Sequence, residues 1–162
     1  RVFERLPLER VRPALAISLH TTHPELRAEL LPKAAPIPPE ELVELAETYA
    51  RTTGYPIQYQ WTLLDGINDT PEELDGIVRL LAGKYAIMNM IPYNSVPDLP
   101  YRRPDWAKAA EIARSLHRRG VLTKLRNSAG QDVEGGCGQL RARLLDGSTQ
   151  VTKAGARATA HG

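Results

Sequence analysis

The sequence predicts an α/β fold of parallel strands, and three observations lead to this expectation. Four apolar stretches rich in branched or aromatic residues are typical of strands, and helical patterns separate them. This alternation favours parallel pairing, because parallel neighbours need a crossover long enough to hold a helix. Four strands are too few to close a barrel of about eight, so the sheet is either small and doubly wound or half of a larger barrel. The chain starts at Arg1, inside a helical pattern, so we expect a segment of a longer protein and favour the half-barrel.

The predicted strands are short, and each is followed by a polar segment. The first and third are apolar along nearly their whole length, as expected for parallel strands that are covered on both faces. The four strands span residues 14–19, 57–64, 85–91 and 121–125.

Three helical patterns connect these strands. The first spans residues 39–53, and the third starts near Pro104 and ends at Gly120. The second begins after Thr70, which can cap it while Glu73 reaches back as a capping box. The predicted inward faces comprise Leu42, Leu45, Ala46 and Tyr49 of the first helix, Leu74, Ile77, Val78 and Leu81 of the second, and Trp106, Ala110, Ala113 and Leu116 of the third.

Charge is divided unevenly along the chain although the net charge is only +2. Residues 21–80 hold 11 acidic and 4 basic side chains, whereas residues 102–143 hold 10 basic and 4 acidic ones. The basic segment predicts attraction to a polyanion, with an ordinary solvated helix face as the alternative. The candidate nucleic-acid contacts are Arg102, Arg103, Arg118, Arg119, Lys124 and Arg126.

No stretch approaches the roughly 18 apolar residues that a membrane span needs, and the first residues lack the pattern of a signal peptide. We therefore expect a cytoplasmic protein with no membrane contact.

Polar residues follow each predicted strand, and in a parallel βα fold these segments share one rim. His20 and His23 are too few for a zinc site, so no metal is assigned, and His20 is expected to donate a hydrogen bond to a ligand. Asp65 and Asp69 favour turn and cap chemistry over an acid–base pair. The loop 92–104 is a candidate binding loop. The residues expected around the mouth are Ser18, His20, Asp65, Asn68, Asn94, Arg126 and Cys137.

Cys137 is the only cysteine of the chain, and Gly135, Gly136 and Gly138 surround it. Glycine flanks allow a bulky partner to approach the sulfur closely, which suits a reactive thiol. A lone cysteine is also commonly a small buried hydrophobe. Local sequence alone leaves both interpretations open.

Taken in order, the strings LAISLH, LLDGIND, MNMIPYN with PYRRP, and RNSAGQDVEGGCGQL resemble the radical S-adenosylmethionine (SAM) RNA methyltransferases of the RlmN and Cfr family. The resemblance implies the C-terminal half of a partial six-stranded, TIM-like βα barrel, followed by an extension strand and a cysteine loop over residues 1–145. Residues 146–162 are expected to be a mobile tail. The family's three-cysteine cluster motif, C-x₃-C-x₂-C, is absent here, as is the second cysteine that resolves the protein–RNA adduct.

By this resemblance, the longer protein uses SAM and a [4Fe–4S] cluster, and its cluster ligands precede this chain. Cys137 is the implied catalytic residue: its sulfur is methylated by one SAM, and a radical formed from a second SAM then takes hydrogen from that methyl group. The resulting carbon radical adds to an adenine ring carbon. The implied SAM contacts are Ser18, Leu19, His20 and Asn94.

The implied product is adenosine methylated at C2 in 23S ribosomal RNA, with transfer RNA as an additional candidate substrate. A reductant such as flavodoxin and a monomeric full-length protein are also implied, and the chain alone is expected to have no turnover. Three alternatives stay open: methylation at C8 by a Cfr-type enzyme, an RNA-binding module without catalysis, and a small metabolite-binding domain with a structural thiol.

Overall fold

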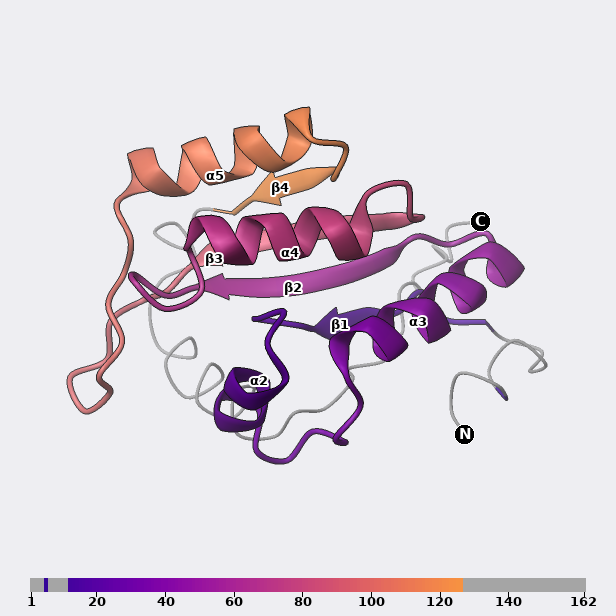
Figure 1. Cartoon of the computed structure of the whole chain (residues 1–162), viewed down its shortest axis with the longest axis horizontal. Coiled ribbons are helices and arrows are strands. Elements are labelled where there is room, and N and C mark those ends of the chain that lie inside the picture. The colour runs from indigo at the N-terminus through magenta and orange to yellow at the C-terminus, as the bar shows by residue number, and fades with distance from the viewer. Residues whose placement is uncertain (1–4, 6–11, 127–162) are drawn as a thin grey trace, which may run out of the picture.

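The computed structural model describes Arg5 and residues 12–126, and Figure 1 shows the arrangement of their helices and strands. Cys137, the glycines around it and the segment 146–162 lie outside the described residues, so the expectations placed on them stay predictions. The elements in chain order are β1 (Ala16–Ser18), α2 (Pro24–Leu30), α3 (Pro39–Thr53), β2 (Ile57–Leu63), α4 (Pro71–Leu81), β3 (Ala86–Pro92), α5 (Trp106–Arg118) and β4 (Thr123–Leu125).

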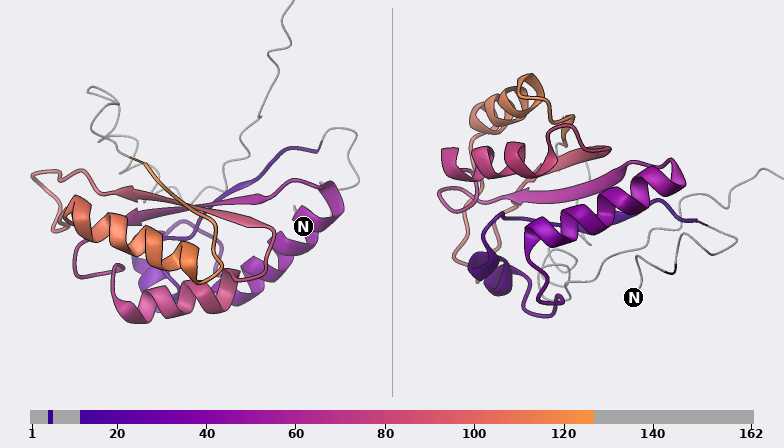
Figure 2. Two further views of the ribbon diagram at one scale, coloured as in Figure 1. Left: turned by 90° about the horizontal axis from the view of Figure 1, so that it is seen from above. Right: turned by 45° about the vertical axis from the view of Figure 1, so that its right-hand side comes forward.

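The sheet has the strand order β1-β2-β3-β4, and each pair of neighbours is parallel. A doubly wound sheet reverses its strand order and carries helices on both faces. Here the order follows the sequence, and Figure 2 shows α3, α4 and α5 along one face of the sheet. This one-sided arrangement is that of a barrel segment, which confirms the α/β class and favours the half-barrel over the small doubly wound sheet.

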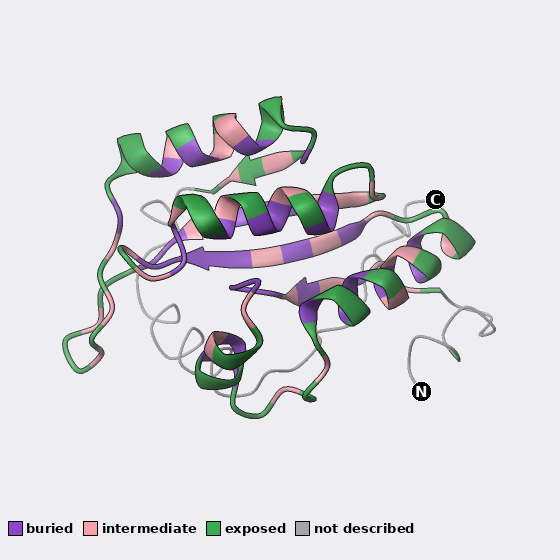
Figure 3. Ribbon diagram, viewed as in Figure 1, coloured by how far each residue is buried: buried purple, intermediate pink, exposed green. Residues whose placement is uncertain are grey.

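The hydrophobic core lies between the sheet and these three helices. Large side chains at alternate positions of β2, including Tyr59 and Trp61, are at most 1% exposed and pack with Ile77 of α4 and Leu116 of α5. Burial in Figure 3 follows the same division, with buried residues on the sheet-facing sides of the helices. On the other face, which holds more polar residues, those of β1, β2 and β3 are also buried or half-buried, so the expected coverage of both faces agrees with the structure.

Helix α4 begins as its sequence predicts, because the Thr70 hydroxyl accepts a hydrogen bond from the Glu73 amide at 3.3 Å. The second half of the predicted capping box is wrong. The Glu73 carboxylate turns instead toward the loop after β1, where it accepts hydrogen bonds from Thr21 and Thr22. Because this loop offers the carboxylate several buried donors, Glu73 binds there and not to the Thr70 amide, which a capping box would require.

The buried face of α5 differs from the prediction. Trp106 is the first residue of the helix and is 47% exposed, so its expected burial is wrong. The buried residues are Ala109, Ile112 and Leu116, whereas Ala110 and Ala113 are half-buried. The helix turns Ile112 to the core because burying a large aliphatic side chain stabilises more than burying an alanine.

Helix α2 is an addition to the expected architecture, because the segment after the first strand was expected to be a loop. Pro24 starts this helix at a position where the missing amide hydrogen costs nothing. With only 7 residues it is too short for a clear apolar period. No helix in the described part of the chain has the length and apolarity needed to cross a membrane.

Candidate functional site

A row of polar side chains crosses the face of the sheet opposite the helices. The strand register aligns Ser18 with Gln60, Gln60 with Asn89, and Asn89 with Lys124. Side chains alternate between the two faces of a strand, and the neighbours of these residues on the other face belong to the core. The row therefore links the SLH segment, residues 18–20, which starts with the last residue of β1, to Lys124 of β4.

Asn89 occupies the middle of this row and is fully buried. Its Nδ2 donates to Gln58 Oε1 at 2.8 Å, whereas its Oδ1 is buried and has no hydrogen-bond partner. A buried acceptor without a donor among the described residues is costly, so the row holds an unused binding group on β3, separated from Ser18 by Gln60. Gln60 and Asn89 were not predicted as site residues, although each is a polar residue between apolar ones, in YQW and MNM, and this pattern is the signal that marks them.

His20 adopts an uncommon backbone conformation two residues after the end of β1, with φ at 60°. A left-handed conformation costs a residue with a side chain about 1–2 kcal/mol. The ring is 4% exposed, and its Nδ1 accepts a hydrogen bond from the Thr62 amide at 2.9 Å. Because an accepting nitrogen carries no proton, the neutral ring is protonated on Nε2 and can only donate there. This tautomer fits the predicted role of His20 as a donor to a ligand.

Burial, and to a smaller extent the nearby Arg27 cation, lower the pKa of His20 from 6.5 to about 4. Arg27 lies on α2 and donates from Nη2 to the Ser18 carbonyl at 3.2 Å, so this cation also holds the SLH backbone. His20 is consequently neutral at pH 7, and the positive charge beside the segment comes from Arg27.

Asn68 connects the loop after β2 to the loop after β1. Its Oδ1 accepts from the Leu64 amide at 2.8 Å, and its Nδ2 donates to the carbonyls of His20 at 2.7 Å and Thr62 at 2.8 Å. The side chain is fully buried, so the expectation that Asn68 faces the mouth is wrong. Both the oxygen and the nitrogen of the Asn68 side chain bind backbone atoms, so this side chain joins two segments of the backbone.

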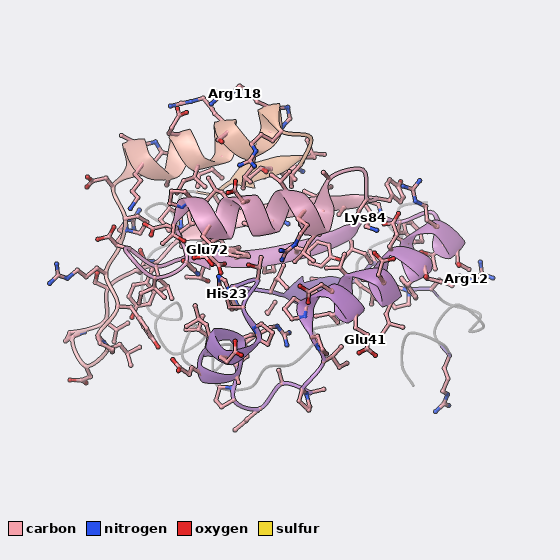
Figure 4. All side chains as sticks on the ribbon, in the orientation of Figure 1. Arg12, His23, Glu41, Glu72, Lys84 and Arg118 are labelled. Carbon is pink, nitrogen blue, oxygen red and sulfur yellow. The ribbon has the colours of Figure 1, made fainter. Side chains whose placement is uncertain are left out.

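The loop 21–23 is fastened to α4 by a buried carboxylate. Glu73 is 1% exposed and accepts from Thr21 Oγ1 at 2.8 Å and from the Thr22 amide at 3.1 Å. His23 Nε2 lies 3.0 Å from Glu73 and 3.7 Å from Glu72, and Figure 4 shows His23 beside Glu72. Burial raises the pKa of Glu73, and the hydrogen bonds from the two threonines oppose this rise.

Asp65 and Asp69 perform the turn chemistry that the sequence favours. Asp69 Oδ1 accepts from the Gly66 amide at 2.8 Å, and its Oδ2 lies 2.7 Å from Lys108 Nζ on α5. Lys108 also lies 3.4 Å from Asp65, and these carboxylates raise its pKa. Both aspartates are thus tied to a cation, and Asp69 also to the turn, so we assign them no acid–base role.

Asn94 lies at the same rim, two residues after β3. Its Oδ1 accepts a hydrogen bond from Arg103 Nη1 at 2.5 Å. A predicted SAM contact and a predicted RNA contact therefore touch each other within the loop 92–104. Tyr93 and Tyr101 stack edge to face at 5.9 Å between ring centroids inside this loop, which stabilises its folded path.

The predicted RNA contacts fall into two groups. Lys124 lies in the polar row, and Arg102, Arg103 and Arg126 follow the carboxyl ends of strands. Arg118 and Arg119 lie at the far end of α5, because a crossover helix runs back toward the start of the sheet, and Figure 4 shows Arg118 well away from His23. These two arginines pair with Glu111 at 3.0 Å and Asp75 at 2.8 Å. The basic segment therefore does not form one patch beside the mouth.

A metal centre does not fit the described residues. They contain no group of three or more His, Cys, Asp or Glu side chains arranged to hold an ion. A [4Fe–4S] cluster needs several cysteine ligands, whereas the whole chain has one cysteine. Any cluster must therefore be bound by residues outside this chain, whereas the SLH segment and Asn94 offer donors and acceptors suited to SAM.

The parallel sheet, its one-sided helices and its polar rim define a segment of a βα barrel with its site at the carboxyl ends of the strands. No protein family model matches the sequence. The chain is 74% identical over 145 residues to a probable RNA methyltransferase of Leptothrix cholodnii, covering 90% of this chain and 42% of that relative. It is 70% identical over 149 residues to a probable RNA methyltransferase of Dechloromonas aromatica, covering 92% of this chain and 42% of that relative. The chain thus spans less than half the length of these relatives.

Two solved structures share the fold. A radical SAM methyltransferase from Sphaerobacter thermophilus matches with a TM-score of 0.76 and 33% identity, over 85% of this chain and 40% of that chain. A domain of a pyruvate-formate lyase-activating enzyme from Bacteroides vulgatus matches with a TM-score of 0.60 over 76% of this chain and 72% of that chain, and at 16% identity it supports the fold alone. The resemblance to radical SAM RNA methyltransferases that the sequence motifs indicate is confirmed by these similarities.

Proposed function

We propose that the chain is the C-terminal part of a radical SAM methyltransferase that methylates C2 of adenosine in 23S ribosomal RNA, with transfer RNA as a second candidate substrate. The observation that carries this proposal is the 74% identity over 145 residues to a protein named as a probable RNA methyltransferase. The likeness to a radical SAM methyltransferase structure supports the type of chemistry. The choice of C2 over C8 rests on the resemblance to the family alone.

In the proposed site, Ser18, His20 and Asn94 bind SAM at the rim. Leu19 has its side chain in the core and its amide bonded to Gln60, so it would contribute only its backbone carbonyl. His20 presents an Nε2–H donor from a ring that stays neutral, so it can bind an acceptor atom of the ligand without adding charge. When bound, SAM and the cluster supply the methyl group and the radical that an unreactive adenine carbon requires. The residues of this chain bind and orient the reactants.

Cys137 is the proposed methyl carrier, and this part of the proposal rests on the sequence alone. The sulfur must first accept a methyl group and then meet the adenine ring, so two bulky partners need access in turn. Gly135, Gly136 and Gly138 provide that access because they place no side chains beside the sulfur.

The polar row supplies a path between the proposed SAM contacts and the RNA. It runs from Ser18 through Gln60 and Asn89 to Lys124, and Arg126 follows at the end of β4. Amide side chains are suited to an adenine edge, and cations to phosphates. We therefore place the target base over the middle of the row and the flanking phosphates near β4.

Mass spectrometry of the full-length protein tests this function. After expression with SAM available, we expect a methyl group on Cys137, and the cluster-loaded protein should then form 2-methyladenosine in ribosomal RNA. A Cys137→Ser variant should retain the cluster and lose the product. Unmodified Cys137 together with tight, salt-sensitive RNA binding would instead support an RNA-binding module, and 8-methyladenosine would assign the C8 chemistry.

A further inference from the structure

The backbone at His20 departs from the path that the sheet would give it. His20 is the one residue other than glycine with a positive φ in the described part of the chain. In the β1–β2 ladder, the Gln58 amide donates to the Leu15 carbonyl. Continuing this spacing by two residues at each step would bring the Thr62 amide to the carbonyl of Leu19.

The ladder does not continue in this way. The Thr62 amide donates to the imidazole Nδ1 of His20 at 2.9 Å, so a side chain takes the place of the next backbone acceptor. The turn at His20 thus ends the pairing of β1 early and fixes the ring against β2. Strained conformations of this kind persist only where the surroundings hold them, and they concentrate at functional sites.

Asn68 is the group that holds this turn. It donates to the carbonyl of His20 at 2.7 Å and to that of Thr62 at 2.8 Å, and thereby joins the strained residue to the strand that its ring also contacts. Its Oδ1 is anchored on the Leu64 amide at 2.8 Å. His20 is therefore fixed twice against β2, once through its ring and once through its backbone.

We propose that Asn68 is a positioning residue for the SAM site: it holds His20 in its left-handed turn so that the SLH segment presents its donors to SAM. This inference rests on the proposed function and extends it to a residue outside the expected contacts. Asn68 touches no ligand in this proposal and acts through His20.

The test uses the full-length protein with its cluster and measures SAM binding by equilibrium dialysis, below the melting temperature of every variant. Asn68→Asp has the same shape but lacks both N–H donors, so the carbonyls of His20 and Thr62 lose their partner. We expect the Kd for SAM to rise about tenfold or more. Thr70→Ala is the matched control: it destabilises the same loop–helix unit, and its Kd for SAM should be unchanged.

A double-mutant cycle separates positioning from general support of the fold. His20→Asn keeps an acceptor near the Nδ1 position and tolerates the left-handed backbone, but lacks the Nε2–H donor. If Asn68 acts through His20, Asn68→Asp should weaken SAM binding much less in the His20→Asn background than in the wild type. Equal losses in both backgrounds would overturn the proposal.

The remaining outcomes are also decisive. A folded Asn68→Asp protein with wild-type affinity for SAM would refute the positioning role while leaving the proposed function intact. Full-length wild-type protein that binds no SAM would refute the proposed function, and the positioning role with it. If Asn68→Asp does not fold, Asn68→Ser removes part of the same bonding, and its SAM affinity is judged by the same criteria.

Discussion

The neutral imidazole of His20 makes the stability of this chain depend on pH. Folding lowers the pKa of His20 from 6.5 to about 4, so the folded state resists protonation that the unfolded state accepts. The stabilisation is therefore fully present above pH 6.5 and is lost as the pH falls toward 4. The difference between these two pKa values corresponds to a change of about 3 kcal/mol in the free energy of unfolding.

We expect the contribution of His20 to the free energy of unfolding to fall by about 2 kcal/mol between pH 7 and pH 5. At pH 5 this histidine is protonated in most unfolded chains but in few folded ones. Urea unfolding of the wild-type chain and of His20→Asn at both pH values measures this contribution as the change in their difference. A difference that does not vary with pH would contradict the assignment of a buried neutral ring.

Gly76 illustrates how closely α4 approaches the loop after β1. A Cβ atom at this position would lie 2.5 Å from Thr22 Oγ1 and 3.0 Å from Thr22 Cβ. We expect Gly76→Ala to destabilise the chain by about 1–3 kcal/mol, as measured by denaturant unfolding. Thr22→Ala removes the closest atom, so in that background the same substitution should cost less; an equal cost would refute the steric explanation.

At the level of single residues, the sequence could indicate chemical types but not their long-range partners. His20 was predicted as a donor because it follows a strand, and its Nε2–H tautomer agrees with that role. The bridging role of Asn68 and the burial of Glu73 depend on contacts with residues 48 and 52 positions away in the sequence. Local motifs carry no information about such pairs, so the capping box was a reasonable but wrong prediction for Glu73.

Among the elements, α4 shows what local sequence can specify. Its proline at the first position and its threonine cap are both short-range features, and both are present in the structure. The face of α5 was predicted less well, because the choice between Ile112 and the neighbouring alanines depends on what the sheet offers to pack against. The polar row could not be predicted for a similar reason. Its residues lie far apart in the sequence, and only the register of the strands brings them side by side.

The cap of α4 can be tested on its own. Removing the Thr70 hydroxyl leaves the Glu73 amide without its partner, so Thr70→Ala should lower the free energy of unfolding by about 1 kcal/mol. Thr70→Ser keeps the hydroxyl and should lose much less. Equal stability of the two variants, measured by thermal or urea unfolding, would show that the cap contributes little here.

For the whole molecule, the positions and ion pairs of the cations predict which of them contribute most to RNA binding. Lys124 and Arg126 have no ion pair with any described residue, whereas Arg118 pairs with Glu111 at 3.0 Å at the far end of α5. In the full-length protein, Lys124→Gln and Arg126→Gln should each weaken RNA binding and reduce the slope of log K against log salt by about 1. Arg118→Gln should change both quantities less.

Titration of RNA binding at several salt concentrations makes this comparison. A loss for Arg118→Gln as large as that for Lys124→Gln would contradict the separation of the basic residues into two groups. It would instead indicate one continuous contact surface that extends along α5.

The outer edge of β1, which pairs with no described strand, has a practical consequence for work with these 162 residues. Among the described strands, β1 pairs with β2 alone, and its residues Ala16, Ile17 and Ser18 are all uncharged. A strand margin without charge or proline invites edge-to-edge association. We expect the chain expressed by itself to self-associate as its concentration rises, which light scattering would detect. Ala16→Lys should suppress this association, because the added positive charges of two facing edges would repel each other.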